Sequence, residues 1–428
     1  MFCQVRVTTS DCDWLRFLWW QDGDIERPLL DHRMLVHVFG ATSSPSCANY
    51  ALKSTADDNK NQFDSEVVDT LRTNFYVDDC LRSTSTEDKA VTLAHELSAI
   101  CEKGGFHLTK WISNRKSVME SIPMCERAET TKNLDLDSNS LPSHKALGML
   151  WLMETDSFNF QIDISDKPPT RRGMLSILSS VYDPLGLVSP VILPAKQILQ
   201  GLCRNKLGWD DEVPGEYQKK WNQWTTSLPE LEQLDVTRCL KPEGFESPSS
   251  AQIHHFADAS DDGYGTATYL RLTNEDGDVE CNLLMGKSRV APIKKVSIPR
   301  MELTAATGAV KIDSWIKQEL EIPVDQTFFW TDSETVLKYV QNEKARFPVF
   351  VANRLAIIHD GSSVDQWRYV PTNVNPADYA SRGMTVSQLI AKKQWLKGPD
   401  FLTEVEECWP STKERSTGKH DISGPPGV

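Results

Sequence analysis

Spacings of apolar and polar residues predict alternating strands and helices in the second half of the chain. Residues 251–268 alternate enough for a strand, and Gly263 and Gly265 indicate that the chain then turns back as a hairpin. A helix is predicted further on, with Pro299 just before its first turn as a start signal. Its apolar positions recur at helical spacing: Leu303, Ala306, Val310, Ile316 and Leu320. This pattern places Glu302 in the first turn of the helix.

Three shorter elements are predicted after this helix. The apolar run at 328–330 (FFW) indicates a buried strand, and residues 331–333 directly after it start another helix with a capping pattern. Residues 366–370 (QWRYV) predict a further short strand. After a loop with Pro and Asn, residues 377–381 open a helix. This part of the chain is therefore predicted to be an α/β domain.

The first half of the chain mixes short strand-like runs with turn signals up to about residue 114, and residues 87–100 have the apolar spacing of an amphipathic helix. The polar stretch 127–144 is predicted to be a loop or hinge. The next block begins with an apolar run at 146–152. It continues with helical patterns at 172–182 and 194–203, which a DPLG turn at 183–186 separates. The Pro, Gly and Ser cluster at 241–250 indicates a domain boundary, and the tail from about Ser411 is predicted to be disordered.

Composition limits the class of protein. The 428 residues carry 46 Lys and Arg against 60 Asp and Glu, and the formal net charge of -14 argues against strong nonspecific nucleic-acid binding by the chain as a whole. Any nucleic-acid contact therefore needs local basic patches. The 10 cysteines form no C-x-x-C pair and no zinc-type spacing, which favours a reducing, intracellular setting over a disulfide framework.

No segment predicts secretion or membrane insertion. The N-terminus lacks the basic segment and apolar core of a signal peptide. The most apolar stretch, residues 174–195, contains Asp183 and several prolines, which disqualifies it as a membrane span. We therefore expect no membrane partner.

Four acidic residues occur in different types of predicted segment: Asp258 in FADAS, Glu302 in PRMEL, Asp332 in WTDS and Asp378 in NPADYASRG. Carboxylates that are gathered together repel one another, so such a set makes sense only if cations neutralise it. Mg²⁺ or Mn²⁺, which prefer oxygen ligands, are the implied cations. A lone Asp at a strand-to-helix turn is more often a cap than a ligand, so the hypothesis depends on the set of four.

The four motifs, in this order and in these element types, resemble the carboxylate set of an RNase H fold nuclease. The resemblance implies two ions, Mg²⁺ or Mn²⁺, which activate a water and stabilise the leaving 3′ oxygen during in-line hydrolysis of a phosphodiester. It implies that Asp258 binds both ions, that Glu302 and Asp332 bind on the side of the scissile phosphate, and that Asp378 binds the ion on the nucleophile side. The loop before Asp378 (VPTNVNPAD) lacks the His that many such enzymes carry there, which is expected to affect turnover rather than metal binding.

A basic stretch leads up to Glu302. Between Gly286 and Glu302 the chain has five basic residues and no acidic one: Lys287, Arg289, Lys294, Lys295 and Arg300. Such a run is usually the solvated face of a strand. Its position directly before the proposed active-site helix makes it the candidate contact for the phosphate backbone of an RNA–DNA hybrid.

A second motif lies far upstream. Residues 74–80 (NFYVDDC) resemble the hairpin on which reverse transcriptases present two adjacent aspartates to metal ions, and residues 39–49 (FGATSSPSCAN) resemble the segment that contacts the incoming nucleotide and the template. The polymerase-like residues are Tyr76, Asp78 and Asp79 in the hairpin, and Gly40, Ser44 and Pro45 in the upstream segment.

Further segments resemble the BEL/Pao class of LTR retrotransposons, a family often labelled by its aspartic peptidase. They are MFCQVRV and LRFLWW near the N-terminus, GFHLTKWISN at 105–114, LGMLW at 147–151, TRRGMLSILSSVYDPLGLVSPV at 170–191 and GWDD at 208–211. The resemblance covers residues 1 to about 383 and implies a fragment of a Pol polyprotein.

The family resemblance implies a multidomain protein of the α/β and α+β classes. The implied domains are a truncated reverse transcriptase palm at 1–125, a thumb or connection region at 126–245, an RNase H-like mixed-sheet α/β domain at 246–385, and a linker with a disordered tail at 386–428. In the family a third catalytic Asp and a fingers region stand before the segment that begins here at Met1, so the polymerase part is expected to be inactive. No Asp-Thr-Gly or Asp-Ser-Gly loop occurs, so no peptidase activity is expected, and integrase regions are absent.

The leading hypothesis is a retrotransposon Pol fragment with a defective RNA-directed DNA polymerase remnant and an RNase H-type endoribonuclease that cuts the RNA strand of RNA–DNA hybrids. The expected partners are the hybrid and other segments of the parent polyprotein, with no small-molecule cofactor. The expected location is the cytoplasm, including virus-like particles, with the nucleus as the alternative. The competing hypotheses are a catalytically inert remnant, a noncatalytic scaffold that binds nucleic acid or protein, and an unrelated RNase H fold transposase.

Overall fold

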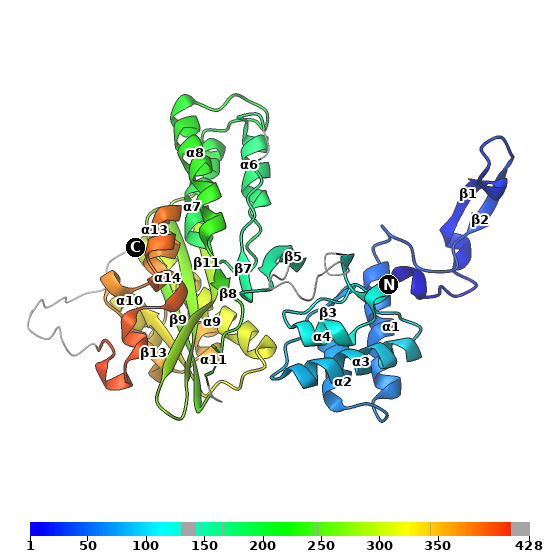
Figure 1. The fold of residues 1–428 in the computed structure, drawn as a ribbon. Helices are drawn as coiled ribbons and strands as arrows, with labels where there is room; N and C mark the ends of the chain where they lie inside the picture. Colours follow the sequence, from blue (N-terminus) through cyan, green and yellow to red (C-terminus); the bar gives the residue numbers. More distant parts are fainter. Residues whose placement is uncertain are drawn as a thin grey trace, which may run out of the picture. The chain divides into compact units, whose positions relative to one another are not determined.

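The computed structural model describes residues 1–129, 143–146, 148–164, 167–242, 244–245, 248–342 and 344–411. Most of the predicted hinge at 127–144, part of the predicted boundary at 241–250, and the predicted disordered tail beyond Ser411 lie outside these residues. The chain forms two compact units, residues 1–147 with 152–154 and residues 148–151 with 155–428 (Figure 1). The predicted multidomain α/β class is confirmed, and the predicted domain bounds stay predictions.

The first unit is built mainly from helices. Its elements are η1 (Phe2–Gln4), η2 (Cys12–Leu15), β1 (Arg16–Trp20), η3 (Gln21–Gly23), β2 (Leu29–Arg33), α1 (Ser44–Asn59), α2 (Ser65–Thr73), β3 (Phe75–Tyr76), β4 (Asp79–Cys80), α3 (Glu87–Lys103), α4 (Lys116–Ser121), η4 (Met124–Glu126) and β5 (Ser143–Ala146). Helices α1, α2 and α3 enclose a core that includes Leu52, Leu71 and Ile100. The helix predicted at 87–100 is confirmed as α3, whose first turn is capped by the Thr86 hydroxyl.

The second unit contains the long strands. Its strands are β6 (Met149–Leu152), β7 (Ser157–Asn159), β8 (Val236–Thr237), β9 (Ser250–Ala259), β10 (Gly263–Thr273), β11 (Val279–Val290), β12 (Gln326–Thr331) and β13 (Trp367–Tyr369). Its α-helices are α6 (Arg171–Ser180), α7 (Ser189–Arg204), α8 (Gly215–Ser227), α9 (Ile298–Glu319), α10 (Glu334–Gln341), α11 (Val349–Gly361), α12 (Ala377–Arg382), α13 (Val386–Ala391) and α14 (Gln394–Lys397). Its 3-10 helices are η5 (Leu228–Gln233), η6 (Val364–Gln366), η7 (Thr372–Val374), η8 (Asp400–Thr403) and η9 (Glu406–Cys408).

A five-stranded mixed sheet is the centre of the second unit, with the strand order β11-β10-β9-β12-β13. The first three strands are antiparallel, while β12 runs parallel to both of its neighbours, β9 and β13. The hairpin predicted from Gly263 and Gly265 is confirmed, since β10 begins at Gly263 and returns along β9. The predicted strands at 328–330 and 366–370 are confirmed as β12 and β13.

Helices cover both faces of this sheet. On one face, α9, α10 and α11 pack through a core that includes Leu303 and Phe329. On the other face, α7 and α12 pack over a core that includes Phe256 and Trp330. Neighbouring residues of β12 thus face different cores, which explains why the FFW run is apolar without alternation.

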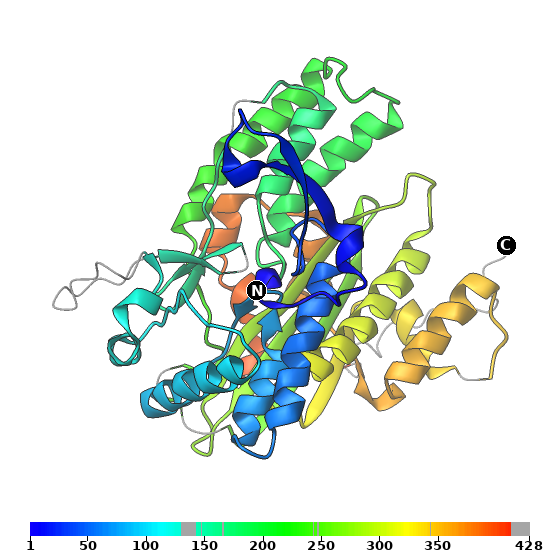
Figure 2. The ribbon, with the colours of Figure 1, turned by 90° about the vertical axis from the view of Figure 1, so that its right-hand side faces the viewer.

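Helices α6, α7 and α8 form a bundle at one end of the sheet (Figures 1 and 2). Helix α7 also packs on β11, and the turn predicted at 183–186 brings the backbone onto the same strand, where Gly286 N donates to Leu185 O at 2.9 Å. Gly186 has φ +74°, and a Cβ there would lie 1.8 Å from the Gly286 carbonyl oxygen. Only glycine therefore allows this close crossing.

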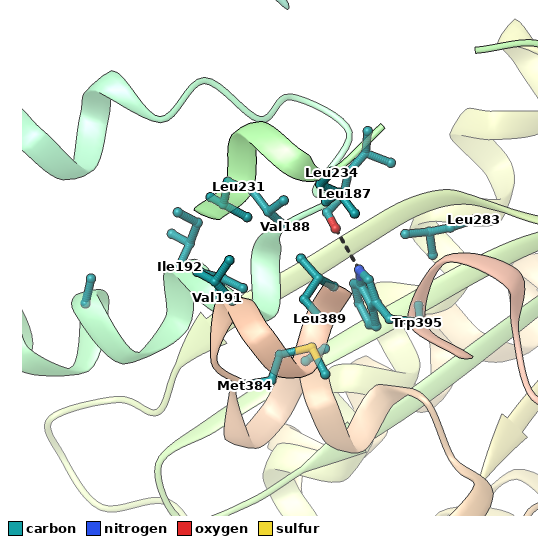
Figure 3. Packing of buried hydrophobic residues seen from close by; sticks show 14 of the residues in the cluster. Leu187, Val188, Val191, Ile192, Leu231, Leu234, Leu283, Met384, Leu389 and Trp395 are labelled. Carbon is teal, nitrogen blue, oxygen red and sulfur yellow. Dashed lines mark hydrogen bonds between the residues drawn. The ribbon is translucent and has the colours of Figure 1, made fainter. Parts of the chain in front are cut away.

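The chain beyond residue 385, predicted as a linker, is folded as far as Ser411. Helices α13 and α14 bring Leu389 and Trp395 into the core beneath α7 (Figure 3). Trp395 is fully buried, and its indole Nε1 donates to Leu187 O at 2.8 Å. The aromatic residues Trp395, Phe401 and Trp409 of this segment complete the core, so it is more than the predicted linker. Among the described residues, no helix combines the length and apolarity that crossing a membrane requires.

Candidate functional site

The four predicted carboxylates come from four elements of the second unit. Asp258 is the penultimate residue of β9, and Asp332 directly follows β12, whose Thr331 is in register with Ala257 of β9. Because β9 and β12 are adjacent and parallel, their carboxyl ends lie at the same edge of the sheet. Asp378 lies in the first turn of α12, which packs on β9 and β10.

The position predicted for Glu302 needs a correction. Helix α9 begins at Ile298, with Ser297 as its extended N-cap and Pro299 inside the first turn, so Glu302 lies in the second turn. Proline fits any position in the first turn of a helix, because its missing N–H would have no partner there, so it does not mark the first residue. Glu302 nevertheless faces the end of β12, since it accepts a hydrogen bond from Ser333 Oγ at 2.6 Å.

Asp258 is the most buried of the four carboxylates, with 4% of its surface exposed. Burial raises its pKa to about 6, the Ser381 hydroxyl that donates to it opposes this rise, and the negative charges of Asp332 and Asp378 add to it. The pKa of Glu302 is also raised, by burial first and by the charge of Asp332, against the effect of the Ser333 hydrogen bond. Electrostatic repulsion therefore couples the carboxylates at this end of the sheet.

Each carboxylate also has a partner within the protein. Asp258 and Glu302 accept from serine hydroxyls, and Asp332 Oδ2 accepts from Thr372 Oγ1 at 2.6 Å. Asp378 forms an ion pair with Arg382, four residues later on α12. The pKa of Arg382 is raised by Asp378 first, and the charges of Asp258 and Asp332 raise it further. The Arg382 guanidinium is thus a counter-ion for this cluster.

The donor chemistry fits a hard divalent cation, because carboxylate oxygens are the ligands that Mg²⁺ and Mn²⁺ prefer. Burial, with the charges of Asp332 and Asp378, raises the pKa of Asp258, and a nearby cation would favour its charged form. In the part of the chain that the structure describes, however, no three His, Cys, Asp or Glu side chains stand close enough together to hold one ion.

The predicted basic run follows the edge strand β11 into α9. Lys287 and Arg289 are exposed on β11, opposite Thr266 and Tyr264 of β10. Lys294 and Lys295 lie in the connection that follows, also exposed. Arg300 lies in the first turn of α9. None of the five forms an ion pair with any of the residues that the structure describes, so their charges face solvent.

Sequence reasoning missed a further cation that packs on α9. Arg354 of α11 stacks 3.4 Å over the ring of Phe350, and the Arg300 guanidinium lies 5.3 Å from the same ring. Arg354 Nε donates to Thr304 Oγ1 of α9 at 3.0 Å, and burial lowers the pKa of its guanidinium. The spacing Phe350–Arg354, one helical turn, could have indicated the stack, but the approach of α11 to α9 could not be read from the sequence.

Sequence reasoning also passed over the hydroxyls that hold the carboxylates. Ser333 and Ser381 belong to the same motifs as Asp332 and Asp378, and Thr372 belongs to the loop noted for its missing His. Their positions inside the motifs were a signal, but which carboxylate each one reaches is decided by the packing of separate elements.

In the first unit, the YVDD motif forms the predicted hairpin. Tyr76 of β3 pairs with Asp79 of β4, and the turn between them holds Val77 at φ 59° together with Asp78. A β-branched residue in the left-handed region is strained, so the surrounding structure imposes this turn. Tyr76 is 69% exposed.

The upstream polymerase-like residues flank the start of α1. Gly40 has φ +88° before the helix, and Ser44 and Pro45 are its first two residues. The Ser44 hydroxyl donates to Val38 O at 2.8 Å, which closes this segment on itself. The roles predicted for these residues stay predictions.

Comparisons with known proteins agree with this architecture. Residues 170–333 match a family model described as a Pao retrotransposon-like RNaseH-like domain. The match includes α6, α7 and α8 as well as β9 to β12, elements that pack in one unit. Among curated proteins, no match was found.

Three solved structures are among the matches of the structural comparison. RNase H1 from the archaeon Halobacterium salinarum is 13% identical, matches 33% of this chain and 98% of its own, and has a TM-score of 0.23. LC11-RNase H1 in complex with an RNA/DNA hybrid is 17% identical. The match covers 31% of this chain and 93% of that one, with a TM-score of 0.22. A foamy viral protease-reverse transcriptase in complex with dsDNA is 15% identical. The match covers 87% of this chain and 66% of that one, with a TM-score of 0.21.

The predicted resemblance to Pao-type retrotransposons is thus confirmed, and it is the sequence match at 170–333 that carries it. Residues 170–333 are similar to a Pao retrotransposon-like RNaseH-like domain, and the chain is a mixed α/β protein of two compact units.

Proposed function

We propose that the second unit hydrolyses the RNA strand of RNA–DNA hybrids, with Asp258, Glu302, Asp332 and Asp378 as its catalytic carboxylates. The observation that best supports this proposal is the buried Asp258, whose pKa of about 6 reflects burial and two neighbouring negative charges. A protein core tolerates such repulsion when a function uses it, and perturbed carboxylates of this kind gather at active sites.

The proposed cofactor is a pair of Mg²⁺ or Mn²⁺ ions. When bound, they would supply a water activated for attack and charge stabilisation for the leaving 3′ oxygen. Asp258, at the end of β9, and Asp332, at the end of the adjacent β12, would hold them, with Glu302 of α9 and Asp378 of α12 as the remaining ligands. Ser333, Thr372 and Ser381 orient these carboxylates through their hydroxyl groups.

The proposed substrate contact is the basic run on β11 and α9. Lys287 and Arg289 project from the exposed edge strand, and Arg300 stands two residues before Glu302. Cations in this position can bind the phosphate backbone of a duplex without reading its sequence. This local charge makes an interaction with the hybrid compatible with a formal net charge of -14.

The remaining sequence-based expectations are part of the same proposal. In it, the YVDD hairpin of the first unit is the remnant of an RNA-directed DNA polymerase, and other segments of a Pol polyprotein are partners. The cytoplasm, virus-like particles included, is the proposed location, with the nucleus as the alternative.

The test is a cleavage assay with the full chain, a hybrid labelled on its RNA strand, and Mg²⁺. We expect cleavage products that disappear in EDTA. The Asp332→Asn variant should lose at least ~100-fold in rate, because even the outer-shell partners of metal ligands typically contribute 10–100-fold. Asp365→Asn, which changes an exposed aspartate in η6, is the matched control and should keep the rate.

A noncatalytic scaffold is the second candidate function. It is favoured by the partners that every carboxylate already has, since the described residues contain no preformed group for one ion. Binding of the hybrid without cleavage, by wild-type protein and Asp332→Asn alike, would establish the scaffold and refute the nuclease.

A further inference from the structure

Arg382 occupies a special position at the carboxylate cluster. Helix α12 is short, and it places Asp378 and Arg382 one turn apart, so that Arg382 Nε donates to Asp378 Oδ1. An ion pair of this spacing on an exposed helix is common and weak. Here, however, the intervening Ser381 donates to Asp258, so the same turn of helix contacts two of the proposed ligands.

The surroundings of the guanidinium are strongly negative. The charges of Asp258 and Asp332, on β9 and after β12, act on Arg382 in addition to that of Asp378. Among the ion pairs of the described residues, only Arg382 pairs with one of the four candidate carboxylates. The arginine side chain is still 58% exposed, so it can swing into solvent without breaking the core.

We infer that Arg382 holds Asp378 while the cation is absent and competes with the divalent cation for that carboxylate. This inference rests on the proposed function, because it presumes that Asp378 is a ligand. Arg382 is thus a positioning residue that sets the affinity of the site for Mg²⁺ or Mn²⁺. Release of Asp378 from the guanidinium is the rearrangement that turns the closed cluster into a site for an ion.

Charge alone determines the direction of the expected effect. A cation that enters beside Asp378 is repelled by the positive charge of Arg382. The cation must also displace the guanidinium from the carboxylate oxygen. Removing that charge while keeping a polar side chain should therefore tighten cation binding. The expected gain is roughly tenfold in Kd, the order expected for one nearby charge at a partly exposed site.

The experiment measures Mn²⁺ binding to the full chain by isothermal titration, without nucleic acid, for wild type and four variants, of which Asp332→Asn removes a proposed ligand. Binding of the hybrid in EDTA is measured separately for wild type and Arg382→Gln. Arg382→Gln should bind Mn²⁺ roughly tenfold more tightly, while Arg382→Lys, which keeps the charge, should stay near wild type. Arg172→Gln is the matched control, because Arg172 forms an exposed ion pair with Asp210 on another part of the unit and should leave the Kd unchanged. Thermal melting in EDTA verifies that each variant is folded.

The outcomes separate this inference from the proposed function. If wild type binds Mn²⁺ in a manner that Asp332→Asn abolishes, and Arg382→Gln binds it equally or more weakly, competition by Arg382 is refuted and the metal site stands. If Arg382→Gln instead weakens binding of the hybrid in EDTA, with Mn²⁺ affinity unchanged, Arg382 is a phosphate contact. If no folded variant binds Mn²⁺, the inference and the proposed metal site fail together.

Discussion

Opposing effects act on the protonation of single carboxylates in this site. The cluster needs ionised carboxylates to attract a cation, yet burial and mutual repulsion favour a proton on Asp258. Hydroxyls from Ser333, Thr372 and Ser381 offset part of this cost by donating to the charged forms. The site is therefore balanced between protonation, internal hydrogen bonds and cation binding.

The raised pKa of Asp258 has a direct consequence for stability. Its folded pKa of about 6 lies above the ordinary aspartate value of 3.8, so the folded state binds this proton more tightly than the unfolded state does. The contribution of Asp258 to the free energy of unfolding therefore falls as the pH rises from about 4 to about 6 and stays low above that range.

Asp258→Asn is expected to remove this loss. In EDTA at about pH 7.5 the variant should raise the free energy of unfolding of the second unit by on the order of 1–3 kcal/mol, and the gain should vanish near pH 4. Urea denaturation at both pH values measures it, with the exposed Asp360→Asn as the matched control. A gain that is equal at the two pH values would show that the charge of Asp258 is not its cause.

At the scale of elements, α9 carries both a candidate metal ligand and a candidate contact for the nucleic acid. It carries Glu302 on the side of β12, while Arg300 and Thr304 meet Phe350 and Arg354 of α11. The two guanidiniums lie over one aromatic ring, and neither forms an ion pair among the described residues. Positive charge that has no ion-pair partner on α9 and α11 among the described residues can be offset by phosphate groups.

Arg354→Ala should weaken hybrid binding. In an Asp332→Asn background, which prevents cleavage, we expect a lower affinity and a salt dependence whose slope, in log Kd against log salt concentration, is reduced by about 1. Fluorescence anisotropy over a salt series measures both. Lys219→Ala, which removes one exposed charge from α8, should change neither quantity. If both variants behave alike, only the total charge of the chain matters and the Arg354–Phe350 stack is not a contact.

At the scale of the second unit as a whole, segments far apart in sequence close one core. Residues from α7, β11, α13 and α14 meet there, and Trp395 hydrogen-bonds to the start of the α7 region through Leu187 O (Figure 3). The carboxylate-bearing helix α12 lies between these elements in the chain and packs on α7 as well as on β9 and β10. The geometry of the site therefore depends on the segment beyond residue 385.

Trp395→Ala tests this dependence. The cavity and the lost hydrogen bond should destabilise the second unit by about 3–5 kcal/mol. Amide hydrogen exchange in β10 and β11 measures this loss of stability in the full chain. The method does not require the two units to unfold in a single two-state transition. Trp209→Ala is the matched control, since Trp209 is 46% exposed, and unchanged protection in both variants would contradict the role of Trp395.

The sequence by itself determined most elements and indicated the candidate residues of the site. Local signals are strong where one short sequence pattern is enough to predict the element. Examples are the hairpin at Gly263, the buried run of β12 and the Ser333 cap of α10. The order of the four acidic motifs also led to the RNaseH-like domain, which the match at 170–333 supports. These features depend on residues close together in the chain, so they can be read from it.

Only the tertiary structure decided how those residues meet. The second-turn position of Glu302, the pairing of each carboxylate with a hydroxyl or Arg382, and the stack of Arg354 on Phe350 all depend on contacts between separate elements. The burial of Trp395 depends on the same long-range packing. Hydrogen bonds and repulsion act over a few ångströms in space, and a pattern of neighbours in the chain does not contain the distances that set them.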